Sequence, residues 1–189
     1  MDEFCSKLQK ILEDVHRSQK FAELKNGILL SFSGAGITGI IDILTEGNNI
    51  SEALRFGLSL TAIMLCMSSA ICSLSFIPKI NVERILWLRT RPSKKLKYLK
   101  DTDNFYYFGH LQKYNSFELL EALNTHYFEG KINPSYKKEY RDIAEQIVIN
   151  SEITFRKFQI FTYAIYFLIL SILVIPIPVI INLFMDIIF

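Results

Sequence analysis

Apolar residues gather in three long runs that carry almost no charge. The runs cover residues 27–44, with Asp42 near the end, residues 56–77, and residues 158–189, with Asp186 as the only charge. An α-helix rises 1.5 Å per residue, so about 20 residues cross a hydrocarbon core about 30 Å thick. The pattern therefore predicts three transmembrane helices, of which the first has the shortest apolar run.

The third run is longer than one span needs. About 18 residues, or about 27 Å of helix, separate Lys157 from Pro176. Pro176 and Pro178 are therefore expected near the outer interface. Residues 177–189 are expected to tilt, kink or lie in the outer leaflet, as a structural end-cap rather than as a pore-lining element.

Two further segments repeat their apolar residues with the period of a helix. Residues 2–25 place an apolar stripe on one face and charges on the other, and residues 136–158 carry a similar stripe. The stripes consist of Phe4, Leu8, Ile11, Val15 and Ala22 in the first segment and of Tyr136, Tyr140, Ile143, Ile147 and Thr154 in the second. Because each segment leads directly into an apolar run, both are expected to continue into transmembrane helices.

The chain between these two segments is also compatible with helix. Residues 82–98 and 116–126 have helical patterns, with a break expected at residues 91–93 and with Ser116 as an N-cap. Residues 130–134, which run from Gly to Pro, are typical of a turn. The predicted fold is an all-α membrane protein with about three transmembrane helices and a cytoplasmic helical bundle whose outer helices continue into the membrane.

Basic residues indicate which side of the membrane each segment occupies. Of the 21 Lys and Arg residues, five precede residue 27, one is Arg55, and fifteen lie between Lys79 and Lys157. Because cytoplasmic loops carry the excess of Lys and Arg, the N-terminus is expected in the cytoplasm and the C-terminus on the periplasmic or external side. The predicted segments are a cytoplasmic amphipathic helix (1–26), transmembrane helix 1 (27–44), an external connection (45–55), transmembrane helix 2 (56–77), a basic cytoplasmic helical module (78–157), and transmembrane helix 3 with a proline-containing apolar tail (158–189).

Small residues recur in the first apolar run. Residues 34–39 match the G-x-G-x-x-G pattern of dinucleotide-binding proteins, but that motif follows a strand, whereas this one lies inside a predicted span. The small residues indicate instead a surface where helix backbones approach closely, within one chain or between chains. The helix-packing residues are Gly27, Ser31, Ala35, Gly36 and Gly39. We expect a homo-oligomer assembled through such a surface.

No residue pattern indicates catalysis or a bound metal. The chain has no Ser-His-Asp order, no P-loop and no recognisable acid/base pair of carboxylates. The three His residues are scattered and form no spaced metal set with the three Cys residues, which are expected to be reduced. The sequence therefore predicts a protein that is not an enzyme, with no catalytic residue, no metal and no cofactor.

Four segments, read together in their order and spacing, resemble the Pycsar effector family, small membrane proteins paired with pyrimidine nucleotide cyclases in bacterial antiphage defence. The first is Ala22-Glu23-Leu24-Lys25-Asn26, which is similar to an A-D-x-K-A motif but departs from it at Glu23 and Asn26. The other three are Phe76-Ile77-Pro78-Lys79, where the second span ends, residues 104–111 with an aromatic-aromatic-Gly motif, and residues 142–157, the most specific of the four. The resemblance covers roughly residues 20–175.

The resemblance implies that the protein is a second-messenger effector. A partner cyclase would make 3′,5′-cyclic CMP (cCMP) or cyclic UMP (cUMP) after infection, and the effector would recognise it and impair the inner membrane, which causes abortive infection. The implied partners are the lipid bilayer, the cyclic pyrimidine nucleotide and the cyclase, with no nucleic acid polymer. Two other interpretations stay open: an ungated small channel, and a passive membrane adaptor that docks a protein partner.

A cyclic mononucleotide carries one negative charge and a flat pyrimidine, so its site needs a basic residue, amide donors and an aromatic face. The ligand-binding or coupling candidates that supply these groups are Lys25, Asn104, Phe105, Tyr106, Gln146, Asn150, Arg156 and Lys157. An alternative for the basic candidates is that they anchor helices at the membrane interface. The corresponding alternatives are interhelical hydrogen bonds for Gln146 and Asn150, and core or membrane-interface packing for Phe105 and Tyr106.

Overall fold

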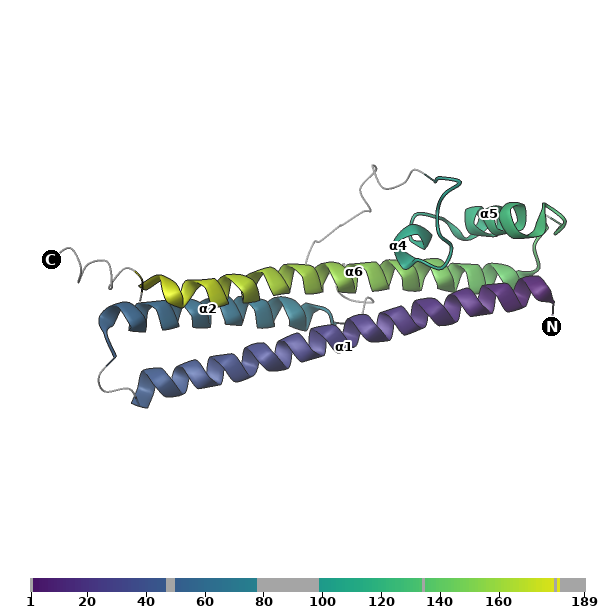
Figure 1. Ribbon diagram of the computed structural model, residues 1–189. Coiled ribbons are helices and arrows are strands. Elements are labelled where there is room, and N and C mark those ends of the chain that lie inside the picture. The colour runs from purple at the N-terminus through teal and green to yellow at the C-terminus, as the bar shows by residue number, and fades with distance from the viewer. Residues whose placement is uncertain (1, 47–49, 78–98, 134, 179, 181–189) are drawn as a thin grey trace. The chain divides into compact units, whose positions relative to one another are not determined.

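The computed structural model describes residues 2–46, 50–77, 99–133, 135–178 and 180, and its regular structure in this part of the chain is entirely helical. The helices are α1 (Glu3–Glu46), α2 (Glu52–Leu74), α4 (Phe108–Leu111), α5 (Ser116–Phe128) and α6 (Lys138–Val174) (Figure 1). The predicted all-α fold is confirmed, including the two long helices that join an amphipathic segment to an apolar run. The helix expected over residues 82–98, with its break at residues 91–93, lies outside the described residues.

Three helical segments are long and apolar enough to cross a membrane. They are α1, α2 and the segment Lys138–Pro178, which contains α6. Their most apolar windows have mean hydropathies of 1.7, 1.8 and 2.5, and at most a third of each window is buried within the chain. Apolar helices can leave so much surface exposed when lipid tails rather than water surround them. The chain is therefore a membrane protein with the three spans that its hydropathy pattern predicts.

The chain divides into two compact units. Unit 1 comprises Met1–Ala22 and Pro78–Phe158, and unit 2 comprises Glu23–Ile77 and Gln159–Phe189. The two longest helices, α1 and α6, each contribute their polar half to unit 1 and their apolar half to unit 2. No break in helical structure occurs in either helix at the unit boundary.

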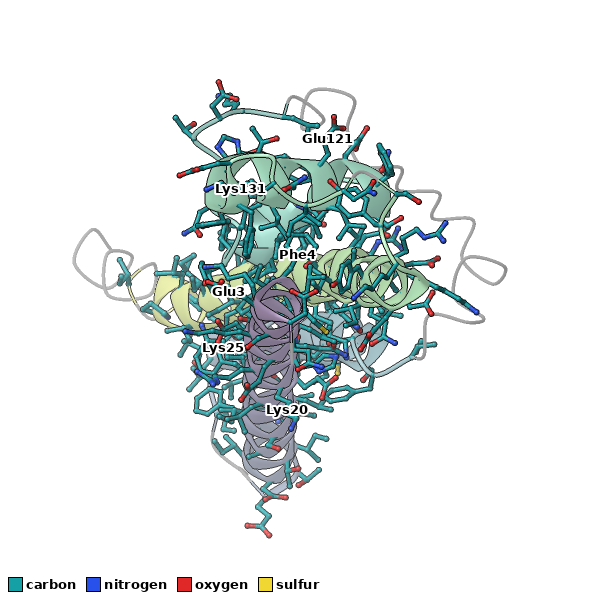
Figure 2. The ribbon with its side chains drawn as sticks, turned by 90° about the vertical axis from the view of Figure 1, so that its right-hand side faces the viewer. Glu3, Phe4, Lys20, Lys25, Glu121 and Lys131 are labelled. Carbon is teal, nitrogen blue, oxygen red and sulfur yellow. The ribbon has the colours of Figure 1, made fainter. Side chains whose placement is uncertain are left out.

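The core of unit 1 forms on the apolar stripe at the start of α1. All members of this stripe are at most 1% exposed: Phe4, Leu8, Ile11, Val15 and Ala22. Figure 2 shows Phe4 at the start of α1, and its ring centre lies 5.0 Å from that of Phe128 on α5 and 5.1 Å from that of Tyr140 on α6. The predicted stripe of residues 136–158, most of which lies on α6, is also buried, except that Ile143 is only partly covered. Since aromatic rings bury large apolar areas, this cluster ties α1 to α5 and α6.

A capping box fixes the start of α5. Asn115, not Ser116, is the N-cap, because the Asn115 side chain accepts a hydrogen bond from the Glu118 N–H and the Glu118 carboxylate accepts one from the Asn115 N–H, both at 2.8 Å. The prediction of Ser116 as N-cap is wrong by one residue, since only Asn115 has a Glu three positions later. At the other end of α5, the chain turns at Glu129 and Gly130, whose φ angles are +54° and +72°.

In unit 2, buried hydroxyl groups on α2 bond to the neighbouring helices. The Ser68 hydroxyl donates to the Ala164 carbonyl on α6 at 2.9 Å, and the Thr61 hydroxyl lies 3.3 Å from the Ser171 carbonyl. Both the hydroxyls and the carbonyls are seven residues apart, so antiparallel α2 and α6 keep a constant register. Ser33 on α1 lies 3.5 Å from the Ser68 hydroxyl. Such polar contacts hold helices together in lipid, where no hydrophobic driving force acts between them.

Two glycines permit close contacts inside unit 2. A Cβ at Gly36 on α1 would lie 3.0 Å from Leu65 Cδ1 on α2, and a Cβ at Gly57 would lie 2.7 Å from Pro178 Cγ. Helix α6 ends at Val174, and residues 176–178, which include both prolines, are helical again after a turn at residue 175. The second proline packs against α2, while residues 181–189 of the predicted tail lie outside the described residues.

Candidate functional site

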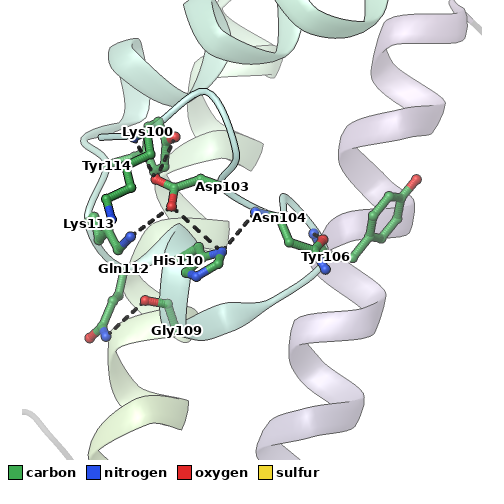
Figure 3. Close-up of polar contacts among 9 residues, drawn as sticks. All are labelled: Lys100, Asp103, Asn104, Tyr106, Gly109, His110, Gln112, Lys113 and Tyr114. Atoms are coloured by element: carbon green, nitrogen blue, oxygen red, sulfur yellow. Dashed lines mark hydrogen bonds and ion pairs between the residues drawn. The ribbon is translucent and has the colours of Figure 1, made fainter. Parts of the chain in front are cut away.

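One buried carboxylate holds the loop that precedes α4. Asp103, whose side chain is 2% exposed, accepts hydrogen bonds from the Lys113 ammonium at 2.8 Å and from the Tyr114 hydroxyl at 3.2 Å (Figure 3). The backbone N–H of Lys100 donates a third bond at 3.2 Å. A buried carboxylate is stable only when it is paired and hydrogen-bonded. Asp103 therefore fastens the loop of residues 99–107 to the turn that follows α4.

These contacts shift the acidity of the cluster. Burial raises the pKa of the Asp103 carboxyl, but the hydrogen bonds from Lys113 and Lys100 and the Lys113 charge outweigh burial and hold this pKa below its ordinary value. Burial, together with the Asp103 charge, raises the pKa of the Tyr114 hydroxyl. At neutral pH Asp103 is thus ionised, and Tyr114 keeps the proton that it donates.

His110 lies beside Asp103 and contacts the same loop. Its Nδ1 accepts a hydrogen bond from the Asn104 N–H at 2.8 Å and therefore carries no proton. The same nitrogen lies 3.7 Å from the Asp103 carboxylate (Figure 3). Through its contact with Asn104, His110 helps to hold the loop.

A pocket of about 250 Å³ opens beside this cluster. Its lining consists of Leu99, Gln112, Lys113, Tyr114, Asn115, Glu118, Val148 and Glu152. Lys113 is paired with Asp103, and Glu152 is paired with Arg156. With the carboxylate of Glu118, the charges of these five groups add up to −1. The pocket therefore suits a neutral or cationic group better than a phosphate.

The aromatic motif at the start of the loop divides between core and surface. Phe105 is 4% exposed and packs its ring against those of Tyr114 and Tyr127, so it belongs to the core of unit 1. Asn104 is exposed, and its side-chain oxygen accepts a hydrogen bond from the Tyr106 N–H at 2.8 Å (Figure 3). Tyr106 is half-buried. Its ring is thus held at the surface of unit 1 by a bond close to its own backbone.

Four other candidates lie on α6 within unit 1. Gln146 is exposed, and its carbonyl accepts a hydrogen bond from the Asn150 side chain at 2.8 Å. Arg156 forms an ion pair with Glu152, one turn earlier, at 2.5 Å. Lys157 is half-buried next to the end of the unit. The bonds of Asn150 and Arg156 described here run along α6.

Lys25 belongs to unit 2, whereas the other seven ligand candidates belong to unit 1. Its ammonium lies 5.4 Å from the ring centre of Phe161 on α6. This is a distance at which a cation is attracted to an aromatic face. Within unit 2, Lys25 therefore contributes to the contact between α1 and α6.

The small residues of α1 point in two directions. Gly36 faces Leu65 on α2, and a Cβ at Gly27 would lie 3.9 Å from the ring of Phe76. The remaining three form an exposed surface, which we call the outer small-residue face: Ser31, Ala35 and Gly39. Only part of the predicted packing set therefore meets another helix within the described part of one chain.

Several residues that shape these units were not found by sequence reasoning. The inward hydroxyls of Thr61 and Ser68 are seven residues apart, and this heptad spacing is a signal that could have found them. Asp103 has no comparable signal, because its side-chain partners follow it by ten and eleven residues across a turn. Among the residues that the structure describes, no three His, Cys, Asp or Glu side chains gather as a metal site requires.

A family model described as the Pycsar effector protein domain matches residues 7–184. The match extends through both units and reaches all three membrane-length helices. No curated protein and no solved structure matches the chain. Because the family match covers nearly the whole sequence, the chain belongs to the Pycsar effector family and has a role in Pycsar antiphage defence.

Proposed function

We propose that this protein is a membrane effector that a cyclic pyrimidine nucleotide, cCMP or cUMP, activates to impair the inner membrane and cause abortive infection. The observation that carries the proposal is the family match over residues 7–184 in a chain with three membrane-length helices. A pyrimidine nucleotide cyclase supplies the ligand. The effector binds this nucleotide without converting it, so it uses no catalytic residue and no cofactor.

The proposed orientation follows from charge. Fifteen of the 21 basic residues lie between Lys79 and Lys157, and five precede the first apolar run. The positive-inside rule then places the N-terminus and unit 1 in the cytoplasm, where the cyclase product appears, and the C-terminus in the periplasm. In this orientation the nucleotide meets the effector without crossing the membrane.

Helix continuity supports a coupling between ligand and membrane. Both α1 and α6 contribute to unit 1 and unit 2. A ligand changes the packing of these helices only if it binds two arrangements of unit 1 with different affinities. Under that condition, a change in unit 1 reaches the spans through two helices rather than through a flexible linker.

The assembly that we propose uses the outer small-residue face. Its members are exposed within a single chain: Ser31, Ala35 and Gly39. Small residues are enriched at contacts between membrane helices, because they let the backbones approach closely. A second copy packed on this face would bring the first spans of two chains close together. The proposed homo-oligomer thus assembles in the membrane through α1.

Dye release from liposomes tests the function. Purified full-length protein is reconstituted in liposomes filled with a self-quenching dye, and cCMP, cUMP, cyclic AMP or buffer is added in parallel. Leakage with one pyrimidine cyclic nucleotide and not with cyclic AMP is the expected result. Chromatography of the added nucleotide after the experiment should return it unchanged.

Other outcomes favour other functions. Equal leakage in all samples, at a level above that of empty liposomes, would indicate an ungated channel. No leakage from protein whose insertion is verified by protease protection would favour an adaptor that docks a protein partner. Consumption of the nucleotide would show that the protein is an enzyme and would contradict the proposal.

A further inference from the structure

One lysine of unit 1 lies between two aromatic rings. The Lys7 ammonium is 4.0 Å from the ring centre of Tyr127 on α5 and 5.0 Å from that of Tyr106 in the loop before α4. We call Lys7, Asn104, Tyr106 and Tyr127 the Lys7 patch. Its members come from three separate segments that the core of unit 1 brings together.

The charge of Lys7 has no acidic partner in the described part of the chain. Lys7 is half-buried and forms no ion pair there, although Glu3 lies one turn away on the same helix. The aromatic faces attract the ammonium but do not neutralise it. An uncompensated positive charge at the surface of a folded unit favours the binding of an anion.

Contacts below the surface hold the groups around Lys7 in place. Phe105 is buried and packs its ring 5.9 Å from that of Tyr127. The Asn104 side-chain oxygen accepts the Tyr106 N–H, which leaves the Asn104 amide hydrogens directed to other acceptors. Tyr127 is 43% exposed, so part of its ring is accessible to a ligand.

Together these groups match a phosphate ester that carries a flat ring. An ammonium is a point-charge partner for phosphate, and an exposed aromatic ring can stack on any nucleobase. The amide hydrogens of Asn104 can donate to a ring carbonyl. The pocket beside Asp103 is less suitable for such a ligand, because the five charged groups described at its lining add up to −1.

We propose that the Lys7 patch is the site at which unit 1 binds the cyclic mononucleotide, with the phosphate on Lys7 and the pyrimidine against Tyr127. This inference rests on the proposed function, in which unit 1 senses a cyclic pyrimidine nucleotide. It adds Lys7 and Tyr127 to the ligand contacts and gives Phe105 the supporting position beneath them.

Calorimetric titration of the full-length protein in nanodiscs with cCMP and cUMP tests the site. Lys7→Gln is expected to weaken binding at least about tenfold, because a hydrogen bond to a charged group is lost. Lys7→Arg, which keeps the charge, should retain most of the affinity. The matched control is Lys20→Gln, which removes the same charge from α1 about 20 Å farther along the helix and should leave binding unchanged (Figure 2).

Substitutions of Tyr127 separate stacking from folding. Tyr127→Ala is expected to weaken binding at least about fivefold, whereas Tyr127→Phe keeps the ring and should preserve it. Circular dichroism melts of each variant verify that unit 1 is folded before titration. Affinity that stays at the wild-type value in folded Lys7→Gln and Tyr127→Ala would overturn the proposed site and leave the proposed function intact.

Two further outcomes separate this inference from its alternatives. A phosphate-bearing lipid headgroup shares part of the ligand's chemistry, so binding to phosphatidylglycerol vesicles is measured with the same variants. Loss of vesicle binding in Lys7→Gln with unchanged nucleotide affinity would assign the patch to lipid and overturn the inference. Wild-type protein that binds neither cyclic nucleotide would overturn both the site and the proposed function.

Discussion

The buried side chain of Asp103 holds the loop in which it lies. Its carboxylate accepts hydrogen bonds from one ammonium, one hydroxyl and one backbone N–H, and almost none of it meets solvent. Bonds to charged, buried groups contribute more than the typical protein hydrogen bond. The loop that presents Asn104 and Tyr106 therefore depends on this one side chain.

Asp103→Asn is expected to destabilise unit 1 by about 2 to 4 kcal/mol, since it leaves the Lys113 ammonium buried without its counter-ion. Thermal unfolding in detergent micelles, followed by fluorescence, measures the change. Asp101→Asn is the control, because Asp101 is exposed and its substitution should change stability by less than about 0.5 kcal/mol. Equal melting of the two variants would show that the Asp103 cluster adds nothing to stability.

The pH dependence of unfolding follows from the same carboxylate. The pKa of Asp103 is lowered in the folded protein from its ordinary value of 3.8, so ionised Asp103 adds stability above that value, and this stability is lost as the pH falls through the folded pKa. Below about pH 4 the melting temperature of the wild type should therefore fall more steeply than that of Asp103→Asn. Parallel acid profiles for the two proteins would contradict the assignment.

Glu129 adopts a left-handed conformation that suits glycine. Its φ of +54° ends α5, and its carboxylate forms an exposed ion pair with Lys131. Glu129→Gly is expected to raise the stability of unit 1 by about 1 kcal/mol, because glycine adopts this conformation without steric cost. Glu129→Ala removes the same ion pair but keeps the strain, so it should give no gain in the same melting experiment.

At the scale of the elements, α1 and α6 could be predicted because their signals are local. The stripe from Phe4 to Val15 and the apolar runs follow helical periodicity, and no Gly or Pro interrupts residues 2–25. Periodicity also gave the correct face of each polar half. It could not predict which helix packs against a given face. It therefore did not separate Gly36, which meets α2, from Gly39, which meets no other helix in the described chain.

The candidate site was less predictable for the same physical reason. Residue type suggested Phe105 and Tyr106 equally, but tertiary packing buries the first and leaves the second at the surface. Lys7 gave no local signal at all, because its aromatic neighbours lie about 100 and 120 residues later in the chain. Chemistry that depends on long-range contacts requires the fold.

Gly36 and Gly39 provide a matched pair of substitutions on one helix. Gly36→Leu should lower the stability of unit 2 by about 1 to 3 kcal/mol, because its Cβ already approaches Leu65 at 3.0 Å. A Cβ at Gly39 would have no atom of another element within 4 Å in the described part of the chain, so Gly39→Leu should leave the stability of the single chain unchanged or slightly higher. Thermal melts in detergent measure both effects.

The same pair tests the proposed assembly. Cross-linking in membranes should show fewer oligomers for Gly39→Leu, since leucine on the outer small-residue face keeps two α1 helices apart. An unchanged oligomer pattern for this variant, together with a normal melt, would place the contact between chains elsewhere.

At the scale of the whole molecule, the proposed signal depends on the continuity of α1, which substitutions can interrupt. Lys20, Glu23 and Leu24 lie around the boundary between the units. Changing all three to Gly costs the helix about 3 kcal/mol relative to changing all three to Ala, while both variants lose the same side chains. If α1 transmits the signal, the Gly variant should bind nucleotide normally but leak at least fivefold less than the Ala variant.

Liposome leakage and calorimetry on these two variants separate transmission from recognition. Equal leakage would show that α1 does not need to be continuous. The signal would then have to reach the spans through α6. Weaker nucleotide binding in the Gly variant alone would mean that the substitutions disturb unit 1 itself.

The stripe at the start of α1 also determines when unit 1 can fold during synthesis. Among the described residues its partners begin at Phe105, about 90 residues after Val15, which a ribosome takes roughly 5 to 18 s to add. Helix α2 is made within this interval. A nascent chain thus completes both of its first two apolar helices before unit 1 can close its core, so the translocon meets those helices while the stripe still requires protection from aggregation.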